Sequence, residues 1–496
     1  MTETEVKVSF DALLSLGIAD VVDGLGHCTI DAVDQEATYF DTERLALTRA
    51  GASLRYRSDD GWTVKLPGQS TDRALVRDEY TIGGEEGEPP SGAVDLVRAW
   101  IRSDALVPIA YLHTHRQRAV IDDSEGAAVE VVVDAVHGRA MASGHSTRFL
   151  EAEVESKRDN VADAVGKAVQ RLEALGGDAR APQTKVARVL GSAASAPADV
   201  AEARLLRRDA SLEDVVRAAI TTGTRRLIEY DAAVRLDTDI EGVHHARTTV
   251  RRLRANLRTF RPWLDREWCE SLRAELRWLG AELGRVRDAD VLLDSLSTKA
   301  HTLPSDERLR ADVLLTRLDA MRRRDFEVLL EAMRSDRYVT LLDQLVDAAN
   351  APRTRPRMPA RGARRAARHV ARRQSRGMRK GVRSLSSTPS DSDLHELRKR
   401  AKKARYALEA VAPILGKKAD RAADALADLQ DVLGAHQDAV VAIAWLSDAA
   451  RDSDTQPIAF AAGRLAARYE LDMVDARRTW QSQWARAKRR LSTVSA

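Results

Sequence analysis

The second half of this 496-residue sequence contains the same two motifs twice, in the same order. VHHARTTVRRLR begins at Val243, and LHELRKRAKKAR begins 151 residues later at Leu394. LGRVRDAD begins at Leu283, and LGAHQDAV begins at Leu433, at an offset of 150 residues. Two motifs repeated at nearly one offset indicate an internal duplication. The helical periodicity around them predicts a duplicated helical bundle.

Each copy of the first motif carries a stripe of basic residues along its helix. The stripes are formed by His244, Arg247, Arg251 and Arg254 in the first copy, and by His395, Arg398, Lys402 and Arg405 in the second. At about 100° per residue, these positions share one helix face. A surface helix solvated by its charges would show a similar pattern. Most of these positions lack an acidic partner four residues on, however, which favours a binding surface for a polyanion.

The net charge is unevenly distributed along the chain. The formal charge of the whole sequence is +4, whereas residues 348–389 contain 12 Arg, one Lys and no acidic residue. This basic block therefore carries +13, and the remainder of the chain carries −9. A block of this kind is often a solvated tail or a nucleic-acid-binding arm.

The first 160 residues or so have the alternation of apolar and polar residues that is typical of strands. We expect strands at residues 4–10, 53–57, 62–66, 77–82, 115–121, 129–136 and 149–156. Residues 161–175 then have the periodicity of a helix and end at two glycines. Residues 179–199 are rich in Ala, Pro and Ser, as linkers are, and from about residue 205 the pattern is helical.

Alternate residues of a strand point to the same side of a sheet, and the expected strands carry charged rows on one side. The first strand has Glu3, Glu5 and Lys7, and the last has Glu151, Glu153 and Glu155. Basic rows lie between them, at Arg55, Arg57, Lys65, Arg77, Arg116 and Arg118. On any single strand, such a row would most often be the solvated face of an amphipathic sheet.

The mixture of acidic and basic rows favours a phosphate site. Guanidinium groups bind polyanion oxygens in forked geometry, and rows of carboxylates suit a hard divalent cation. If the sheet closes, both rows face one lumen, where the carboxylates would repel one another unless a metal neutralised them. The sequence has no Gly-x4-Gly-Lys-Ser/Thr loop, so any phosphoryl transfer would depend on this lumen.

Several other classes of protein are disfavoured. The two cysteines, Cys28 and Cys269, have no metal-ligand spacing and are typical of a protein with reduced thiols. The N-terminus lacks the layout of a secretory signal, and no apolar run approaches the roughly 18 residues of a membrane span. We therefore expect a cytoplasmic protein without a membrane partner. Aromatic residues make up only 4% of the chain, which counts against stacking on nucleic-acid bases.

The N-terminal rows resemble those of the CYTH domain, the triphosphate tunnel metalloenzymes. The resemblance rests on ETEVK, SLRYR, TVKLPG, the alternate arginines of HRQRAV, VVVD and the final glutamate-rich strand, which occur in that family's order. It implies an eight-stranded antiparallel tunnel, and with the helical half an α+β protein of two domains. It also implies that the tunnel binds triphosphate with Mg²⁺ or Mn²⁺ and cleaves a phosphoanhydride bond.

The resemblance also implies roles for individual residues. The metal would be held by Glu3, Glu5, Glu151 and Glu153, with Glu153 and Glu155 as an alternative final pair. The phosphates would be gripped by Lys7, Arg55, Arg57, Lys65, Arg77, Arg116 and Arg118. Asp134 would orient or activate the attacking water, and we count Lys7 with it as catalytic.

The helical repeats resemble the CHAD domain, through HxxRxxxRRLR at His244 and HxxRxxxKKxR at His395. This implies two four-helix bundles around a basic cavity that binds inorganic polyphosphate through the eight stripe residues. Residues 364–383 align with 211–230, so we expect much of the basic block to be a helix lining the cavity, after a loop at 352–359. Asp288 and Asp438 recur at matched places, and we expect them to hold basic side chains.

The expected domains are a tunnel at residues 1–178, a linker at 179–204, and a helical domain at 205–496 with repeats at 205–350 and 360–496. Together they predict a metal-dependent inorganic triphosphatase that binds polyphosphate and associates with polyphosphate granules. Inorganic chains are favoured over nucleotides and thiamine triphosphate by analogy alone. The alternatives are a non-catalytic polyphosphate-binding scaffold, and nucleic-acid binding through the basic block.

Overall fold

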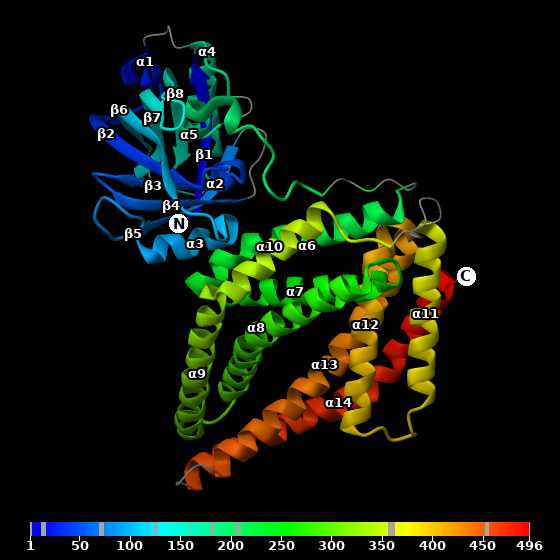
Figure 1. The fold of residues 1–496 in the computed structure, drawn as a ribbon. Helices are drawn as coiled ribbons and strands as arrows, with labels where there is room; N and C mark the ends of the chain where they lie inside the picture. The colour runs from blue at the N-terminus through cyan, green and yellow to red at the C-terminus, as the bar shows by residue number, and fades with distance from the viewer. Residues whose placement is uncertain are drawn as a thin grey trace. The chain divides into compact units, whose positions relative to one another are not determined.

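The computed structural model describes residues 2–10, 16–68, 74–123, 126–158, 160–179, 183–203, 206, 210–355, 363–451 and 456–495. The chain divides into two compact units, Met1–Ala201 and Glu202–Ala496. Figure 1 shows that strands dominate the first unit and that helices make up the second. The predicted α+β protein of two domains is therefore confirmed.

The first unit is built around a closed barrel of eight antiparallel strands. The strands are β1 (Thr2–Phe10), β2 (Cys28–Asp41), β3 (Ser53–Arg57), β4 (Gly61–Pro67), β5 (Ala74–Ile82), β6 (Val107–Asp123), β7 (Gly126–Ala140) and β8 (Ser146–Ser156). Their order around the barrel is β1-β5-β4-β3-β2-β6-β7-β8, and the pairing of β1 with β8 closes it. The eight-stranded antiparallel fold implied by the resemblance is confirmed.

Two strands differ from the prediction, one that was not expected and one that begins earlier than expected. No strand was expected where β2 lies, and β6 begins at Val107, well before residue 115. Residues 29–34 of β2 are all exposed, so neither face of this half of the strand is apolar. A strand that is exposed to solvent on both faces has no period-two hydrophobic pattern by which it can be recognised.

Two helices cover one side of the barrel, α1 (Ile18–Val22) and α4 (Ala162–Ala174), and α4 confirms the helix predicted at residues 161–175. Their apolar side chains, such as Leu172 of α4, pack against outward-facing residues of the strands, among them Val8 and Val131. Because successive residues alternate across a strand, burying Val6 and Val8 outward turns Glu5 and Lys7 into the barrel. Two further helices are α2 (Ala46–Arg49) and α3 (Ser91–Ile101).

A short helix, α5 (Lys185–Leu190), docks on the barrel within the segment predicted to be a linker, and η1 (Gly191–Ala193) follows it. Thr184 caps α5 by accepting a hydrogen bond from the Ala187 N–H. Val186 and Val189 are buried in a core that includes residues of β2, β6 and β7. A Cβ placed on Gly138 would lie 2.3 Å from Val189, so the glycine permits this close approach.

The second unit contains nine helices among its described residues. They are α6 (Leu212–Leu236), α7 (Ile240–Phe260), α8 (Arg266–Ala300), α9 (Ser305–Arg334), α10 (Asp336–Asn350), α11 (Ala363–Arg383), α12 (Asp391–Leu415), α13 (Lys417–Arg451) and α14 (Gln456–Ser495), with η2 (Arg261–Trp263) between α7 and α8. α8 and α13 are each 35 residues long, and their first residues are 151 positions apart. The helix predicted at 364–383 is confirmed as α11, whereas part of the loop expected before it lies outside the described residues.

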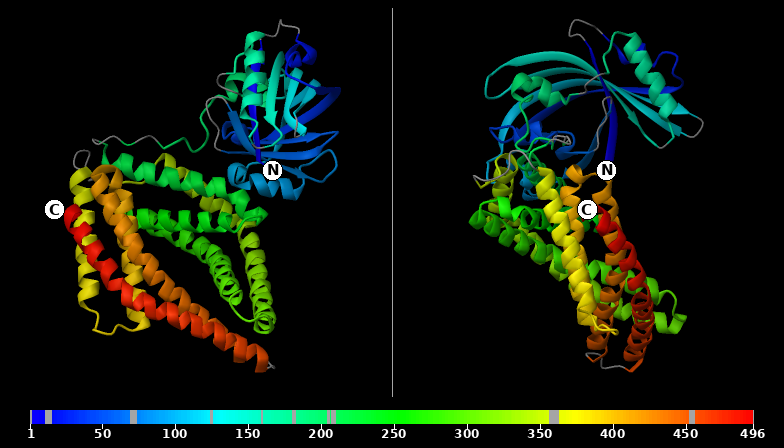
Figure 2. Two further views of the ribbon diagram at one scale, coloured as in Figure 1. Left: turned by 180° about the vertical axis from the view of Figure 1, so that it is seen from behind. Right: turned by 90° about the vertical axis from the view of Figure 1, so that its right-hand side faces the viewer.

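The two repeats differ in their last helix. α14 runs unbroken for 40 residues, whereas the matching part of the first repeat is divided into α9 and α10 (Figure 2). Ser335 lies at the break and caps α10 by accepting a hydrogen bond from the Tyr338 N–H. The matching position in α14 is Arg486, which offers no such cap. Among the helices described, none is long and apolar enough to cross a membrane.

Candidate active site in the barrel and candidate polyanion surface in the helices

The interior of the barrel contains acidic side chains that are removed from solvent. Asp134, Glu151 and Glu5 are 0%, 1% and 3% exposed, and the predicted lysine Lys7 is 4% exposed. Register explains the grouping, because Lys7 on β1 pairs with Glu153 on β8 and Asp134 on β7 pairs with Glu151. Charged groups buried to this degree are costly unless they are paired, so the cluster must be held together by its own ion pairs.

Lys7 lies at the centre of this cluster. Its Nζ is 3.3 Å from Glu151 Oε1 and 3.7 Å from Glu5 Oε1, and it also pairs with Glu153. Burial opposes a charged Lys7, but the three glutamates outweigh this effect and raise its pKa above the ordinary value. Lys7 is therefore a permanent cation among the carboxylates of the barrel.

Arg116 forms a second set of ion pairs across the interior of the barrel. Its Nε and Nη2 atoms donate to the two oxygens of Asp134 at 2.9 and 2.7 Å, and Nη2 also donates to Glu153 at 3.1 Å. This is the forked geometry in which guanidinium groups bind carboxylates and phosphates. A phosphate oxygen entering the barrel would compete with Asp134 for the same donors.

The structure adds a cation that the sequence analysis did not identify. Lys185, the first residue of α5, places its Nζ 2.9 Å from Asp134, 3.0 Å from Glu151 and 2.6 Å from Glu153. Arg188, one turn on, donates to Glu151 at 3.1 Å and lies over the ring of Phe149. The only local signal for α5 is Thr184 ahead of KVARVL, and a helix this short has too few turns to show periodicity.

Lys185 and the carboxylates fix each other's charge. Burial raises the pKa of Glu153, but Lys185, Lys7 and Arg116 together hold it well below the ordinary value. Burial likewise lowers the pKa of Lys185, and the surrounding carboxylates, first Asp134, raise it well above the ordinary value. The ammonium of Lys185 thus neutralises Glu151 and Glu153, two of the four glutamates that were predicted to hold a metal.

Three further phosphate candidates, Arg55, Lys65 and Arg77, line the same cavity. Lys65 Nζ lies 2.7 Å from Glu79, and Arg77 pairs with Glu5. Arg55 lies 3.9 Å from Glu79 and also hydrogen-bonds Tyr39. Tyr39 comes from the strand that the sequence analysis missed. Burial raises its pKa, but Arg55 and Lys185 outweigh this effect and lower it.

Two predicted residues lie outside this cluster. Arg57 is held by Asp59 at 2.6 Å and Asp60 at 3.1 Å, in the turn between β3 and β4. The side chain of Arg118 is 45% exposed, and it pairs with Asp31 at 2.7 Å. Neither residue lines the cavity that contains Lys7 and Arg116.

The positions of the three glutamates on β8 distinguish between the two alternative metal-binding pairs. Glu151 and Glu153 join the central cluster, whereas Glu155 is partly exposed and lies 3.6 Å from Lys157. The geometry therefore favours Glu151 and Glu153 over Glu153 and Glu155 as the pair on β8. Glu3 lies on β1 in register with Arg77, but its side chain is outside the described part of the structure.

The cavity enclosed by these residues has a volume of only about 60 Å³. Thr184, Lys185 and Val186 of the α5 segment form part of its wall. Sites for small ligands usually enclose roughly 300 to 1,000 Å³. A triphosphate can therefore enter only if charged side chains or α5 move.

The donors at the centre suit a hard divalent cation. Glu5, Asp134, Glu151 and Glu153 offer only carboxylate oxygens, which are the ligands that Mg²⁺ and Mn²⁺ prefer. Their charges are matched by lysine ammonium groups, in the place where a metal would otherwise be needed for neutrality. The residues present thus fit a metal, provided that Lys185 withdraws.

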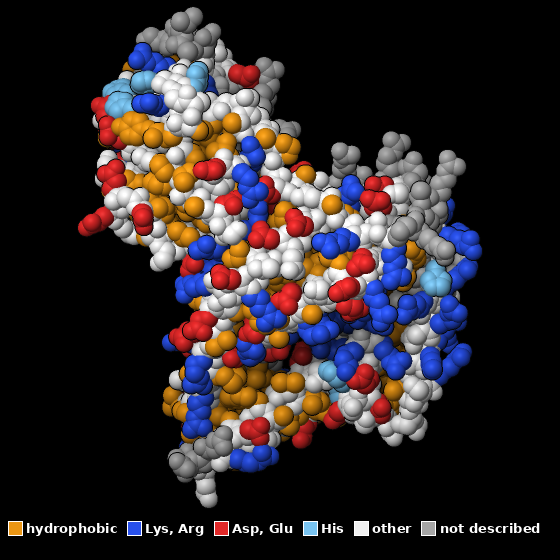
Figure 3. Space-filling view, viewed as in Figure 1, with side chains coloured by type: hydrophobic (Ala, Val, Ile, Leu, Met, Phe, Trp, Pro, Cys, Tyr) orange, Lys and Arg blue, Asp and Glu red, His pale blue; other side chains and the backbone are white. Residues whose placement is uncertain are grey.

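In the second unit, the two predicted stripes come together between α7 and α12. Arg251 Nε donates to the Tyr406 hydroxyl at 2.6 Å, and its guanidinium lies over the Tyr406 ring. Burial and the neighbouring Arg251, Arg398 and Arg247 lower the pKa of Lys402 to about 7. Figure 3 shows Lys and Arg side chains gathered around a hollow on the helices. Residues 151 positions apart in the sequence therefore contribute to one basic surface.

The matched acidic residues meet the stripes in both repeats. Arg247 donates to Asp288 at 2.8 Å, and Arg398 lies 3.9 Å from Asp438. The guanidinium of Arg247 lies across Gly284, and that of Arg398 lies across Gly434, within 3.4 to 3.9 Å of where a Cβ would stand. The second repeated motif thus supplies the glycine and the acid that position each arginine.

The other stripe residues are less uniform. Arg405 donates to Glu409 at 2.7 Å, whereas Arg254 faces Arg277 and Arg273, and burial with these neighbours lowers its pKa. The buried Nδ1 of His395 has no hydrogen-bond partner among the described residues. Such a donor or acceptor is expensive to leave unpaired, which favours a bound ligand or water there.

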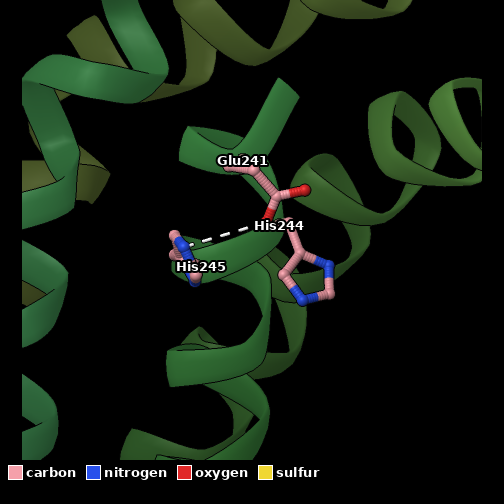
Figure 4. Close-up of side chains that lie close together, drawn as sticks. All are labelled: Glu241, His244 and His245. Carbon is pink, nitrogen blue, oxygen red and sulfur yellow. Dashed lines mark ion pairs between the residues drawn. The ribbon is translucent and has the colours of Figure 1, made fainter. Parts of the chain in front are cut away.

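His244 begins the first stripe beside Glu241 and His245, and Figure 4 shows these three side chains at the start of α7. Each offers one ligand atom, and these atoms all lie within 4.8 Å of one another. Burial, then Arg287, lowers the pKa of His244. The guanidinium of Arg287 lies 4.0 Å from Glu241, and this positive charge opposes a metal cation at the same place.

These geometries agree with sequence comparisons to known families. Residues 1–187 match the CYTH domain, and residues 218–447 match the CHAD domain. The chain is a CYTH domain followed by a CHAD domain. CYTH domains have a triphosphate tunnel fold, and the family implies a phosphoanhydride hydrolase that depends on a divalent metal. CYTH and CHAD domains together suggest phosphate-containing ligands.

Similar proteins include Rv2226 of Mycobacterium tuberculosis, which is 29% identical over 428 residues, covering 82% of this chain and 80% of that protein. Among solved structures, the CHAD domain of the plant Ricinus communis is 26% identical, with a TM-score of 0.47, covering 57% of this chain and 94% of that one. HpAC1 of Hippeastrum, described as having dominant triphosphatase activity, is 16% identical with a TM-score of 0.24, and covers 38% of this chain and 95% of that one.

Proposed function

We propose that the CYTH barrel hydrolyses phosphoanhydride bonds of inorganic triphosphate and short polyphosphate with a divalent metal, and that the CHAD helices bind polyphosphate. The observation that carries the proposal is the meeting of buried carboxylates and buried cations in one closed barrel. Phosphoryl transfer needs positioning and charge neutralisation more than covalent catalysis, and this interior offers both. We also propose a cytoplasmic location, in association with polyphosphate granules.

In this proposal, Glu5, Glu151 and Glu153 hold Mg²⁺ or Mn²⁺, together with Glu3 as the sequence predicts. A bound metal would neutralise phosphate oxygens and lower the barrier to attack at phosphorus. Glu151 and Glu153 share the ammonium groups of Lys7 and Lys185. Metal binding would therefore replace neutralisation by lysine with neutralisation by the metal.

The substrate phosphates are held by the basic side chains of the cavity, Arg55, Lys65, Arg77 and Arg116. Arg116 is central because its forked donors already face Asp134, and a phosphate that takes over these donors frees the Asp134 carboxylate. The freed carboxylate can then accept a hydrogen bond from water and orient it toward phosphorus. Lys7 stays charged among the glutamates of the cavity and stabilises the negative charge that develops. Arg57 and Arg118, away from the centre, would guide longer chains at the rims.

In the CHAD domain, the eight stripe residues contact polyphosphate. The support for this proposal is that Arg247, Arg251, Arg398 and Lys402 form one basic surface from two distant parts of the sequence. The mutual repulsion of these groups, and the free-energy cost of burying their charges, are offset when a polyanion binds. Among the residues that the structure describes, this surface has no equivalent of the buried carboxylate cluster in the barrel, so it would hold a phosphate chain without cleaving it.

Phosphate release from purified protein tests the catalytic proposal, with inorganic triphosphate, ATP and thiamine triphosphate compared in Mg²⁺ and in Mn²⁺. Glu5→Gln should reduce kcat by about a hundredfold or more if the carboxylate holds the metal. Glu173→Gln, the same change at an exposed position on α4, should leave the rate unchanged. If none of the substrates is hydrolysed, or if Glu5→Gln matches the unaltered protein, the catalytic proposal is wrong.

One observation favours a second function, that of a polyphosphate-binding scaffold without catalysis. The cavity of about 60 Å³ is too small for a triphosphate, and Lys185 lies where a metal would bind. Under this alternative, Glu5→Gln keeps full polyphosphate binding, Arg251→Ala and Lys402→Ala lose it, and no phosphate is released under any metal condition.

A further inference from the structure

A second basic pocket lies in the CHAD domain, beyond the ends of the predicted stripes. It has a volume of about 420 Å³, within the range of small-ligand sites. Most of its basic lining comes from four helices and the short turn η2. These residues are Arg258 of α7, Arg261 of η2, Arg266 and Arg273 of α8, Arg373 of α11, and Lys403 of α12.

The charge of this pocket is unbalanced. Its lining includes no Asp or Glu among the described residues. Arg261 and Arg273 share Glu270, at 2.9 and 2.6 Å, but Arg258, Arg373 and Lys403 have no acidic partner within the described part of the chain. Cations gathered in a recess repel one another, and this cost is recovered when an anion enters.

The pKa shifts of the basic groups in the pocket also indicate an uncompensated positive charge. Burial lowers the pKa of Lys403, and Arg258 and Arg373 lower it further. Burial also lowers the pKa of Arg258, with contributions from Arg273 and Arg254. Because four different helices supply these cations, the convergence is a property of the fold and not of one charged helix face.

The pocket continues the first stripe but is distinct from it. Arg258 lies one further turn along α7 from Arg254, the last residue of the stripe. Lys402 and Lys403 are neighbours in the sequence, yet Lys402 faces Arg251, Arg398 and Arg247, whereas Lys403 faces the pocket. One helix therefore serves two basic sites with adjacent residues.

The pocket draws residues from both repeats, but its charge is not repeated at the positions related by the duplication. The position that matches Arg258 in the second repeat is Glu409, which pairs with Arg405 at 2.7 Å and with Arg252 at 3.5 Å. At the end of the second stripe, the acidic Glu409 forms ion pairs with two arginines. At the matching end of the first stripe, Arg258 lines the pocket. The two ends of the basic surface are thus chemically different.

We propose that this pocket is a separate site for a compact run of condensed phosphates. Its ligand is either free triphosphate or the terminal part of a longer polyphosphate chain that lies along the stripes. The inference rests on the proposed binding of polyphosphate by the CHAD domain. Converging guanidinium groups suit the crowded oxygens of condensed phosphate, and the recess limits the length of chain that fits.

Lysine labelling tests the pocket at the level of single residues. The full chain, with its metals chelated, is acetylated under limiting conditions, and tandem mass spectrometry reads Lys402 and Lys403 separately. Triphosphate should protect Lys403 and leave Lys402 reactive, whereas long-chain polyphosphate should protect both. Lys403→Gln and Arg373→Gln should each weaken triphosphate binding, measured by calorimetry, by about fivefold to tenfold. In Arg373→Gln, a correspondingly higher triphosphate concentration should be needed to protect Lys403. The matched variant Lys399→Gln, at an exposed position on α12 outside the pocket lining, should leave triphosphate binding unchanged, and Lys402→Gln tests whether the stripe is a separate site.

The outcomes separate this inference from the function on which it rests. If long-chain polyphosphate protects Lys402 but neither ligand protects Lys403, the pocket inference fails and polyphosphate binding stands. If long-chain polyphosphate protects neither lysine and does not bind in calorimetry, the proposed CHAD function fails as well. Equal loss of triphosphate binding in Lys402→Gln and Lys403→Gln would mean one continuous surface without a separate pocket.

Discussion

Lys185 Nζ lies 2.9 Å from Oδ2 of Asp134, which joins the first residue of α5 to the middle of β7 inside the barrel. The same ammonium is within 3.0 Å of Glu151 and Glu153. A lysine and a divalent cation cannot both occupy the space between these carboxylates. α5 therefore has to give up this contact before the carboxylates can hold a metal.

Removal of this ammonium should favour metal binding. Lys185→Met removes one of the cations that the buried Asp134, Glu151 and Glu153 share, so the protein in chelator should lose about 3 kcal/mol of stability. Mn²⁺ should then bind the variant more tightly than the unaltered protein and restore its thermal stability. Calorimetric titration with Mn²⁺ and thermal unfolding in chelator measure the two effects. Lys167→Met, at an exposed position on α4, serves as the control. Equal Mn²⁺ affinity in both proteins would show that Lys185 does not compete with the metal.

The docking of α5 can be loosened from the barrel side. A Cβ on Gly138 would lie 2.3 Å from Val189, so Gly138→Ala should displace α5 and withdraw Lys185. Hydrogen exchange in residues 185–190 should become faster, and Mn²⁺ affinity should rise as in Lys185→Met. Gly166→Ala is the matched control, because a Cβ there would meet no atom within 4 Å. Unchanged exchange in α5 would argue against a tight docking at this contact.

Polyphosphate binding should depend on pH through Lys402. Its pKa of about 7 means that the side chain loses its charge as the pH rises past neutrality. It faces Arg251, Arg398 and Arg247, and the carboxylate of Asp288 opposes their effect. A bound polyanion favours the charged form, so affinity should fall by about tenfold between pH 6 and pH 8. Lys402→Arg, which stays charged, should show a flatter profile at equal ionic strength. Parallel profiles for the two proteins would exclude Lys402 as the source.

The two adjacent arginines of α7 should differ in their effect on binding. Arg251 lies in the basic surface and is held by Tyr406, whereas Arg252 lies 3.5 Å from Glu409. Arg251→Ala should weaken polyphosphate binding by about tenfold, and Arg252→Ala should change it little. Calorimetry at two salt concentrations measures both, and similar losses in the two variants would indicate non-specific attraction to positive charge.

Alternation in the strands was enough to predict much of the barrel interior. Outward Val6 and Val8 are covered by helices, so Glu5 and Lys7 point inward as the spacing required. The exposed half of β2 has no hydrophobic pattern, and Tyr39 was missed with it. Lys185 could not be found because its environment is made by β7 and β8, and nothing in the six residues of α5 encodes that contact locally.

The helical repeats were predictable for a different reason, since a duplicated motif marks both copies at once. Helices α8 and α13 follow the offset of the motifs. The offset could not reveal that Ser335 would divide the last helix of the first repeat, because a cap takes effect only where the chain leaves the helix. It also could not reveal that Lys402 and Lys403 would serve different sites, which depends on the packing of α11 and α7 around α12.

A linear phosphate chain has two identical ends and therefore no direction of its own. The basic surface of the CHAD domain does have a direction, because Arg258 stands at one end and Glu409 at the matching place of the other. A bound chain would consequently be anchored from one side only, whichever of its ends arrives first. Chains of different length would share the anchored end and differ in how far the free end extends, so the domain would measure length from a fixed origin.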